Sequence, residues 1–251
     1  MPTFRALVSS AFECEVLCSP FEVVRTLFPH DLREEDLARI SEEYAHLQLD
    51  LEERYKQAHL LCPKGWSLGQ SSSLLLYLIA RIRKPATTLE TGVGNGHSTF
   101  FLLNALLKNE RGLLYSTDTS KSAGVLLRDA EKASWALEFI DPARRHAAFR
   151  RAVNRLPLID FSVHDSDHSY SWSRFEYDTV VTKMGPSSVL ASDDVDLSYS
   201  FIDFAKSIGI EPTILVDRTK AFGVIPLRQL SGRAKLLDSK GEKYSNRLNH
   251  R

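Results

Sequence analysis

A glycine-rich stretch at 88–99, T-L-E-T-G-V-G-N-G-H-S-T, has the residue types and spacing to bind a nucleotide-type ligand. Glycine lets the backbone turn sharply and come close to a ligand. An apolar run ending at Leu89 predicts a buried strand before the glycines, and the apolar run at 100–107 predicts a buried helix after them. Because the start of a helix offers free N–H groups, the stretch indicates a ligand site at the first strand-to-helix turn of an α/β sheet.

The spacing of these glycines separates two classes of cofactor. Dinucleotide-binding enzymes prefer G-x-G-x-x-G, whereas here three glycines at every second position follow Glu90. The resulting acidic-x-G-x-G-x-G pattern resembles motif I of the class I S-adenosylmethionine (SAM) methyltransferases. The resemblance implies that SAM is the cofactor and that the Glu90 carboxylate helps to hold its cationic methionine end.

In the same family, a second carboxylate at the end of the next strand accepts hydrogen bonds from the ribose hydroxyls. Asp118 ends the run at 113–117 and stands 22 residues after Gly96, so the resemblance implies this role for it. A turn or a helix N-cap is the other role that the local sequence leaves open for Asp118. The expected cofactor-binding residues are Glu90, Gly92, Gly94, Gly96, Ser98 and Asp118.

Acidic side chains also follow two later apolar runs, at 158–164 and 188–192. Because the carboxyl ends of parallel strands face one crevice, we expect these carboxylates to lie together beside the glycine loop. Like charges a few ångströms apart resist ionisation unless a cation neutralises them, and a hard divalent ion such as Mg²⁺ prefers oxygen ligands. The expected cluster contains Asp165, Asp167, Asp193 and Asp194.

The stretch D-S-D-H-S-Y that begins at Asp165 and the pair Asp193-Asp194 are similar to segments of the small cation-dependent O-methyltransferases. That group includes the catechol, caffeoyl-CoA and antibiotic-sugar enzymes. The resemblance implies that Asp165, Asp193 and Asp194 bind Mg²⁺, and it places His168 where the plant and catechol enzymes have a catalytic lysine. The resemblance thus implies that His168 and Asp165 are the catalytic residues. Histidine titrates near neutral pH, so deprotonation can differ from that in the lysine enzymes or be left mostly to the metal. Helix capping by the carboxylates and a hydrogen bond from His168 to the backbone are the structural alternatives.

Composition narrows the classes of partner. The chain has 251 residues, with 32 Lys and Arg against 32 Asp and Glu, so no net field would recruit nucleic acid or a membrane. The apolar runs are too short to span a bilayer. Three cysteines, Cys14, Cys18 and Cys62, indicate a reducing compartment rather than a disulfide framework. We therefore expect a cytoplasmic protein whose partner is a small molecule.

Residues 1–85 are predicted to form an N-terminal helical extension. Asp31 with Glu34 three residues later has the spacing of a capping box, and apolar residues then recur at spacings of three and four over about six turns. A solvated helix packed on the core is the plainest interpretation. A lid over the substrate and a contact between two copies in a homodimer are the other roles left open.

Strands and helices alternate over 86–230, and the polar tail 231–251 follows. We predict a Rossmann-like α/β fold with a seven-stranded, mostly parallel sheet and an antiparallel last strand. Arg218 and Lys220 are expected to be solvated in the turn of the final hairpin. The predicted strands are 87–91, 113–117, 136–140, 158–164, 188–192, 213–217 and 222–227, and the predicted helices are 97–108, 121–133, 142–153, 171–184 and 198–208.

The sequence therefore predicts a SAM-dependent O-methyltransferase that uses Mg²⁺ and methylates a hydroxyl of a sugar, catechol or natural product. One alternative is a metal-independent SAM methyltransferase, acting on nitrogen or oxygen, whose acidic cluster is structural. An NAD-type oxidoreductase is a second alternative, which the glycine spacing disfavours. A non-catalytic SAM-binding scaffold is a third, and it would need none of the acidic and histidine residues.

Overall fold

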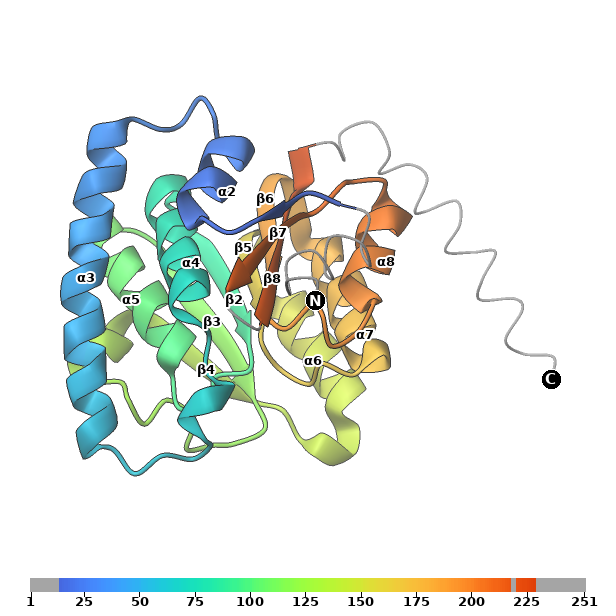
Figure 1. Ribbon diagram of the computed structural model, residues 1–251. Coiled ribbons are helices and arrows are strands. Elements are labelled where there is room, and N and C mark those ends of the chain that lie inside the picture. The colour runs from blue at the N-terminus through green and yellow to red at the C-terminus, as the bar shows by residue number, and fades with distance from the viewer. Residues whose placement is uncertain (1–13, 218–219, 229–251) are drawn as a thin grey trace, which may run out of the picture.

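One mixed sheet of eight strands runs through the molecule in the order β1-β7-β8-β6-β5-β2-β3-β4 (Figure 1). The computed structural model describes residues 14–217 and 220–228. β8 is antiparallel to both of its neighbours, β6 and β7, and the other pairs are parallel. The strands are β1 (Val16–Leu17), β2 (Thr87–Thr91), β3 (Leu113–Asp118), β4 (Trp135–Phe139), β5 (Ile159–His164), β6 (Met184–Ser192), β7 (Thr213–Asp217) and β8 (Lys220–Pro226).

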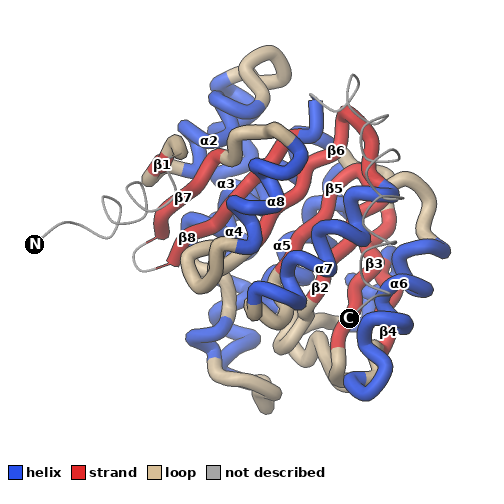
Figure 2. The backbone as a smooth tube through the Cα atoms, turned by 90° about the vertical axis from the view of Figure 1, so that its right-hand side faces the viewer, coloured by secondary structure: helices blue, strands red, loops and turns tan. Residues whose placement is uncertain are grey.

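Helices cover both faces of this sheet, as Figure 1 and Figure 2 show from two directions. One face carries α2 (Pro20–Leu27), α3 (Glu34–Gln57), α4 (Gln70–Arg83) and α5 (His97–Asn109). The other carries α6 (Arg145–Arg155), α7 (Tyr170–Val180) and α8 (Ser200–Ile208). Short 3₁₀ helices lie between them: η1 (Lys64–Trp66), η2 (Asp129–Ser134), η3 (Pro142–Arg144) and η4 (Val181–Lys183). The predicted Rossmann-like α/β fold with an antiparallel last strand is confirmed.

The helix α4 lies in the middle of the largest apolar core. Residues 75–80 are all 0% exposed, as expected for a helix that is apolar on every side. α3 packs on α4 and α5: its Tyr44 ring stacks on Phe101 at a centroid distance of 4.9 Å, and the Tyr44 hydroxyl donates to the Gln70 carbonyl at 3.0 Å. The described part of the predicted N-terminal extension is therefore packed tightly on the α/β core.

An eighth strand was not predicted. Val16 and Leu17 pair in parallel with Ile214 and Leu215 at the edge of the sheet. Val16 is buried. This short strand covers the otherwise open edge of β7, which would present unpaired backbone groups.

The predicted helix at 121–133 is wrong. Only η2 (Asp129–Ser134) is helical there, and the chain before it binds to the glycine loop through backbone hydrogen bonds. Gly124 N donates to Gly94 O at 3.0 Å, and Leu126 N donates to Asn95 O at 3.0 Å. A helix would need those N–H groups for its own ladder, so the contact with the loop prevents it.

The predicted capping box at Asp31 is also wrong. α3 begins at Glu34 with Arg33 as the N-cap residue. The Asp31 carboxylate instead accepts from Arg83 Nη1 at 2.6 Å, at the end of α4. This ion pair ties the loop before α3 to α4.

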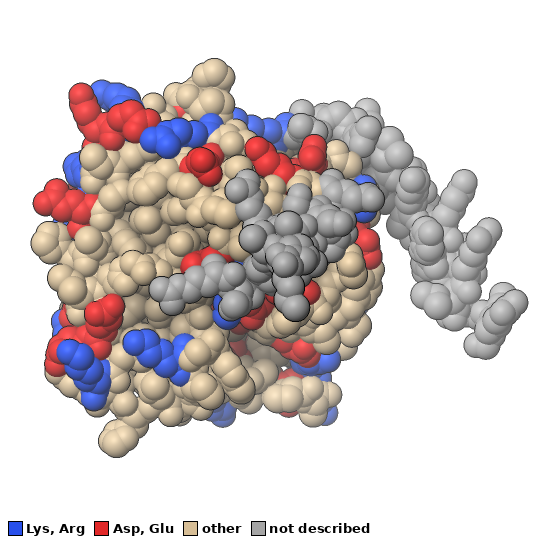
Figure 3. Space-filling view, in the orientation of Figure 1, with Lys and Arg blue, Asp and Glu red and all other residues tan. Residues whose placement is uncertain are grey.

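The surface shows no separation of charge on the face seen in Figure 3, where acidic and basic side chains are interspersed. This agrees with equal numbers of acidic and basic residues in the sequence. In the described ranges, no helix has the length and apolar character needed to cross a membrane. The predicted tail 231–251 lies outside the described residues.

Replacement of Gly124 by alanine should destabilise the fold. Gly124 has φ +88°, and a Cβ there would lie 2.7 Å from Trp135 Cη2. We expect the free energy of unfolding to fall by about 1–3 kcal/mol, measured by urea denaturation. Gly65→Ala is the control, because nothing lies within 4 Å of a Cβ there. Equal losses in the two variants would contradict the prediction.

Candidate active site

The glycine loop between β2 and α5 depends on the backbone freedom and small size of its glycines. Gly92, Gly94 and Gly96 have φ values of +83°, +50° and +93°, in the left-handed region that other residues rarely adopt. A Cβ on Gly92 would lie 1.9 Å from the carbonyl oxygen of Asp165. A Cβ on Gly96 would lie 2.9 Å from Gly124 Cα. The loop is thus pressed against the end of β5 on one side and against the 119–128 segment on the other.

Asp118 holds the glycine loop in shape and lines a cavity. Its Oδ2 accepts from Val93 N at 2.8 Å and Gly94 N at 2.9 Å, and its Oδ1 accepts from Ser120 N at 2.7 Å. Asp118 can therefore hold the turn and also bind a ligand in the cavity, which are the two roles that the sequence left open for it. Oδ2 already accepts two hydrogen bonds, whereas Oδ1 accepts one and can accept another.

Glu90 is placed differently from the expectation. Its carboxylate is 0% exposed and lines neither of the two cavities at the loop. It accepts hydrogen bonds from the hydroxyls of Ser98 (2.7 Å), Thr99 (2.9 Å) and Ser116 (2.7 Å). Burial raises the pKa of Glu90 to about 7, although these hydroxyls oppose the shift. Glu90 therefore joins β2, β3 and the start of α5 beneath the loop. This differs from the expectation that its carboxylate contacts the methionine end of SAM directly.

Two adjoining cavities lie above the loop. The first, of about 500 Å³, is lined by Ser98, His97, His168, Asp194 and Lys220 among others. The second, of about 390 Å³, is lined by Thr117, Asp118, Ile140 and Trp172 among others. They share the lining residues Cys62, Trp66, Gly92, Gly94, Asp165, Ser166 and Asp167. The expected residues Gly92, Gly94, Ser98 and Asp118 thus line this double cavity, whereas Gly96 packs below it.

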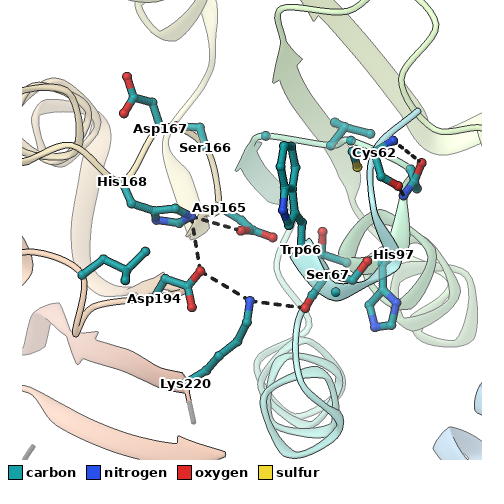
Figure 4. Close-up of a pocket in the computed structure, with 17 residues that line it drawn as sticks. Cys62, Trp66, Ser67, His97, Asp165, Ser166, Asp167, His168, Asp194 and Lys220 are labelled. Atoms are coloured by element: carbon teal, nitrogen blue, oxygen red, sulfur yellow. Dashed lines mark hydrogen bonds and ion pairs between the residues drawn. The ribbon is translucent and has the colours of Figure 1, made fainter. Parts of the chain in front are cut away.

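The segment between α3 and α4 forms one wall of the cavities. Asn95 fixes it: its Oδ1 accepts from Leu61 N at 2.8 Å, and its Nδ2 donates to Cys62 O at 2.9 Å. His97 adds a second tie through hydrogen bonds to Tyr55 Oη at 3.0 Å and Ser73 Oγ at 2.9 Å. Trp66, at the end of η1, remains 70% exposed and stands in the cavity opposite the acidic cluster (Figure 4).

The ends of β5 and β6 bring acidic side chains together, as the sequence predicts. His168 Nε2 lies 3.7 Å from Asp165 Oδ1 and 3.8 Å from Asp194 Oδ2 (Figure 4). Asp193, beside Asp194, has a side chain that is 0% exposed, and its Oδ1 has no hydrogen-bond partner. Three of the four expected carboxylates therefore form one cluster, in which Asp165 and Asp194 line the first cavity and Asp193 is fully buried.

Asp167 does not belong to this cluster. Its Oδ2 accepts from Arg145 Nη1 at 2.8 Å, and its Oδ1 accepts from Ser169 N at 2.9 Å just before α7. In Figure 4 its carboxylate points away from His168 and Asp165. The backbone hydrogen bond at the start of α7 draws it aside, which corrects the expected grouping of four.

Lys220, the first residue of β8, reaches into the cluster. Its Nζ lies 3.3 Å from Asp193 Oδ2, 3.4 Å from Asp194 Oδ2 and 3.4 Å from Ser67 O. This lysine was expected to be solvated in a hairpin turn, and that expectation is wrong. Arg218, its companion in that expectation, lies outside the described residues.

Burial and charge set the protonation states in the cluster. Burial raises the pKa of Asp165 well above its usual range, and Asp193 raises it further. Burial and the charge of Asp194 raise the pKa of Asp193 to about 7. Burial lowers the pKa of Lys220, but the surrounding carboxylates outweigh it, so the pKa rises and the ammonium stays charged. Burial, aided by His164, lowers the pKa of His168 to about 4, which leaves a neutral imidazole.

The cluster can be compared with what Mg²⁺ requires. Carboxylate oxygens from Asp165, Asp193 and Asp194 are the right kind of ligand, and the unpartnered Asp193 Oδ1 is an available donor atom. However, the Lys220 ammonium contacts two of these three carboxylates. Within 14–217 and 220–228, no three His, Cys, Asp or Glu side chains are grouped so that they could hold a metal ion. The oxygen ligands alone would suit Mg²⁺, but the Lys220 ammonium lies against two of the three carboxylates.

The sequence reasoning missed a buried pair next to the cluster as well as Lys220. His164 Nδ1 lies 2.5 Å from Glu176 Oε2, and both side chains are almost fully buried. Thr91 Oγ1 and Ser166 Oγ donate to the same oxygen at 2.7 Å and 3.0 Å. The sequence held a signal for it, because His164 ends an apolar strand where a polar residue needs a partner.

Comparison of the sequence with known protein families gives one match that covers the glycine loop and the acidic cluster. Residues 89–195 match the model of a family described as a methyltransferase domain. No curated protein matches the sequence significantly.

Several solved structures share the fold. One is the Podospora anserina methyltransferase PaMTH1 bound to SAH, with 14% identity, coverage of 77% of this chain and 96% of that chain, and a TM-score of 0.52. An O-methyltransferase from Bacillus cereus in complex with SAH has 14% identity, coverage of 82% and 96%, and a TM-score of 0.51. TomG, an O-methyltransferase from Streptomyces achromogenes involved in tomaymycin synthesis, in complex with SAM, has 16% identity, coverage of 64% and 81%, and a TM-score of 0.50.

Glu90 should make stability depend on pH. Its pKa is about 7 in the folded protein against an ordinary value of 4.5, so its contribution to stability is complete below the lower value and is lost as pH rises through the higher one. Relative to Glu90→Gln, the wild-type free energy of unfolding should fall by about 2–3 kcal/mol between acidic pH and pH 8. Urea denaturation across this range measures it, with Glu42→Gln on the exposed side of α3 as the control. Parallel curves for wild type and Glu90→Gln would contradict it.

Proposed function

Because residues 89–195 match a family model described as a methyltransferase domain, we propose that the protein transfers the methyl group of SAM to a hydroxyl of a small molecule. The observation that carries the proposal is the position of His168, a neutral base in a cavity that the glycine loop also lines. A hydroxyl needs such a base to become a nucleophile.

The second cavity supplies the groups that an adenosine needs. Asp118 has acceptor capacity left for ribose hydroxyls, and Ile140 and Trp172 offer apolar surface to the adenine ring. Gly92 and Gly94 line both cavities, so a ligand can pass close to their backbone from one to the other. When bound, SAM supplies an electrophilic methyl group on a positively charged sulfur.

The first cavity supplies the groups that an acceptor needs. Its volume of about 500 Å³ suits a small molecule, and Trp66 and Leu197 give it exposed apolar surface. His168 Nε2 can take the proton of the acceptor hydroxyl, and the carboxylates of Asp165 and Asp194 at 3.7 and 3.8 Å would stabilise the resulting imidazolium. Methyl transfer otherwise requires mainly in-line positioning of the two reactants.

The resemblance implies a Mg²⁺ ion held by Asp165, Asp193 and Asp194, which would lower the pKa of a bound hydroxyl. The Lys220 ammonium among these carboxylates favours the metal-independent alternative instead. We therefore assign no step of the reaction to a metal ion. Deprotonation is assigned to His168.

Removal of the proposed base should slow catalysis without weakening cofactor binding. We expect His168→Ala to lower kcat by about 10²- to 10⁴-fold and to leave the Kd for SAM unchanged. The assay is mass-spectrometric detection of SAH and methylated product with a panel of catechols, sugars and natural-product aglycones. His46→Ala, on the exposed side of α3, is the control. Binding of NAD but not SAM would refute the proposed function, and unchanged turnover in His168→Ala would refute the role of His168 as the base.

Loss of the Asp118 carboxylate should weaken SAM binding. Because the side chain also supports the loop through Val93 and Gly94, we expect Asp118→Ala to raise the Kd for SAM by about 10- to 100-fold, as for the loss of charged hydrogen bonds. Isothermal titration calorimetry measures it. Asp129→Ala, at a fully exposed side chain in η2, should bind SAM like the wild type. A wild-type Kd in Asp118→Ala would rule out the assigned ribose contact.

A further inference from the structure

The ammonium of Lys220 has three hydrogen-bond acceptors from the protein. Its three N–H donors face three acceptors from different parts of the chain: Asp193 and Asp194 after β6, and the Ser67 carbonyl after η1. Figure 4 shows the contacts with Asp194 and Ser67. The lysine side chain is 22% exposed. Lys220 is thus one of the residues that join the acidic cluster to the segment carrying Trp66.

The backbone at the start of β8 is held by strand pairing and by two hydrogen bonds. Lys220 pairs with Asp217 of β7. The next residue, Ala221, donates to Asp196 Oδ1 at 3.0 Å and accepts from Val195 N at 2.9 Å. Both bonds tie β8 to the loop that holds the acidic pair. The register of β8 therefore aims this side chain at the cluster.

The charge of the cluster requires a cation there. Asp193 is fully buried, and the side chains of Asp165 and Asp194 are 15% and 17% exposed. Isolated carboxylates are costly to bury unless they are paired. His168 lies more than 3.5 Å from its nearest carboxylates, beyond the distance of a hydrogen bond. Lys220 is the ammonium or guanidinium group in direct contact with the pair among the described residues.

We propose that the Lys220 ammonium is the resident cation of the cluster formed by Asp165, Asp193 and Asp194, so that methyl transfer proceeds without a divalent metal ion. This inference rests on the proposed methyltransferase function. Lys220 acts here as a positioning residue: it holds Asp194 beside His168, and it neutralises carboxylates that would otherwise attract a metal ion. Because its donors are already used, it does not need to touch the acceptor.

The test compares Mn²⁺ binding by wild type, Lys220→Met and a control, using electron paramagnetic resonance of the free ion. Methionine is unbranched and nearly as long as lysine, but it carries no charge. Lys206→Met, on the exposed side of α8, is the control. We expect no stoichiometric binding by wild type or by Lys206→Met. Lys220→Met should bind one Mn²⁺ per chain, at least about tenfold more tightly than wild type.

A second arm measures SAH formation after the wild-type protein is dialysed against EDTA, with turnover expected to stay unchanged. Stoichiometric Mn²⁺ binding by wild type, loss of turnover after chelation, or no gain of Mn²⁺ binding in folded Lys220→Met would each overturn the inference. If Lys220→Met does not fold, the two wild-type measurements decide, and Lys220→Arg should retain the wild-type metal behaviour. Failure of the methyltransferase function itself is visible separately, as absence of SAM binding by calorimetry.

Discussion

The close approach of two strand ends is the constraint on which the site depends. The backbone at Gly92 comes so near the Asp165 carbonyl that no side chain fits between them, and Asp165 N donates to Thr91 O at 2.8 Å. This contact follows from the parallel pairing of β2 with β5. It places the glycine loop after β2 directly beside the acidic cluster after β5 and β6. Because both are at the carboxyl ends of neighbouring strands, they face one crevice.

Within that crevice, the balance of charge and burial sets the protonation states of the acidic and histidine side chains. Several carboxylates close together need a cation, and either a metal ion or a protein ammonium can serve. Lys220 provides the ammonium from the antiparallel strand, which enters the sheet between β6 and β7. The same enclosure keeps His168 neutral. One arrangement of the sheet thus accounts for both a compensated acidic cluster and an available base.

The N-terminal region contributes to the site through packing rather than as a separate unit. α4 lies inside the core, and the segment before it is held against the glycine loop by Asn95 and against the acidic cluster by the Ser67 carbonyl. A change in α3 or η1 would therefore reach the cavity walls directly. His97 belongs to this support, because both of its ring nitrogens are hydrogen-bonded to Tyr55 and Ser73.

The sequence by itself determined the features that depend on neighbouring residues. Apolar runs located β2, β3, β5 and β6, and residue spacing located the glycine loop and the acidic residues after β5 and β6. Tertiary structure alone decided the rest, because each remaining feature needs a partner far along the chain. Gly124 gives its N–H to the glycine loop instead of to a helix, and Glu90 turns toward Ser116 instead of toward the cavity. Lys220 is a surface residue in the sequence pattern and becomes the counter-charge of Asp193 only through the register of β8.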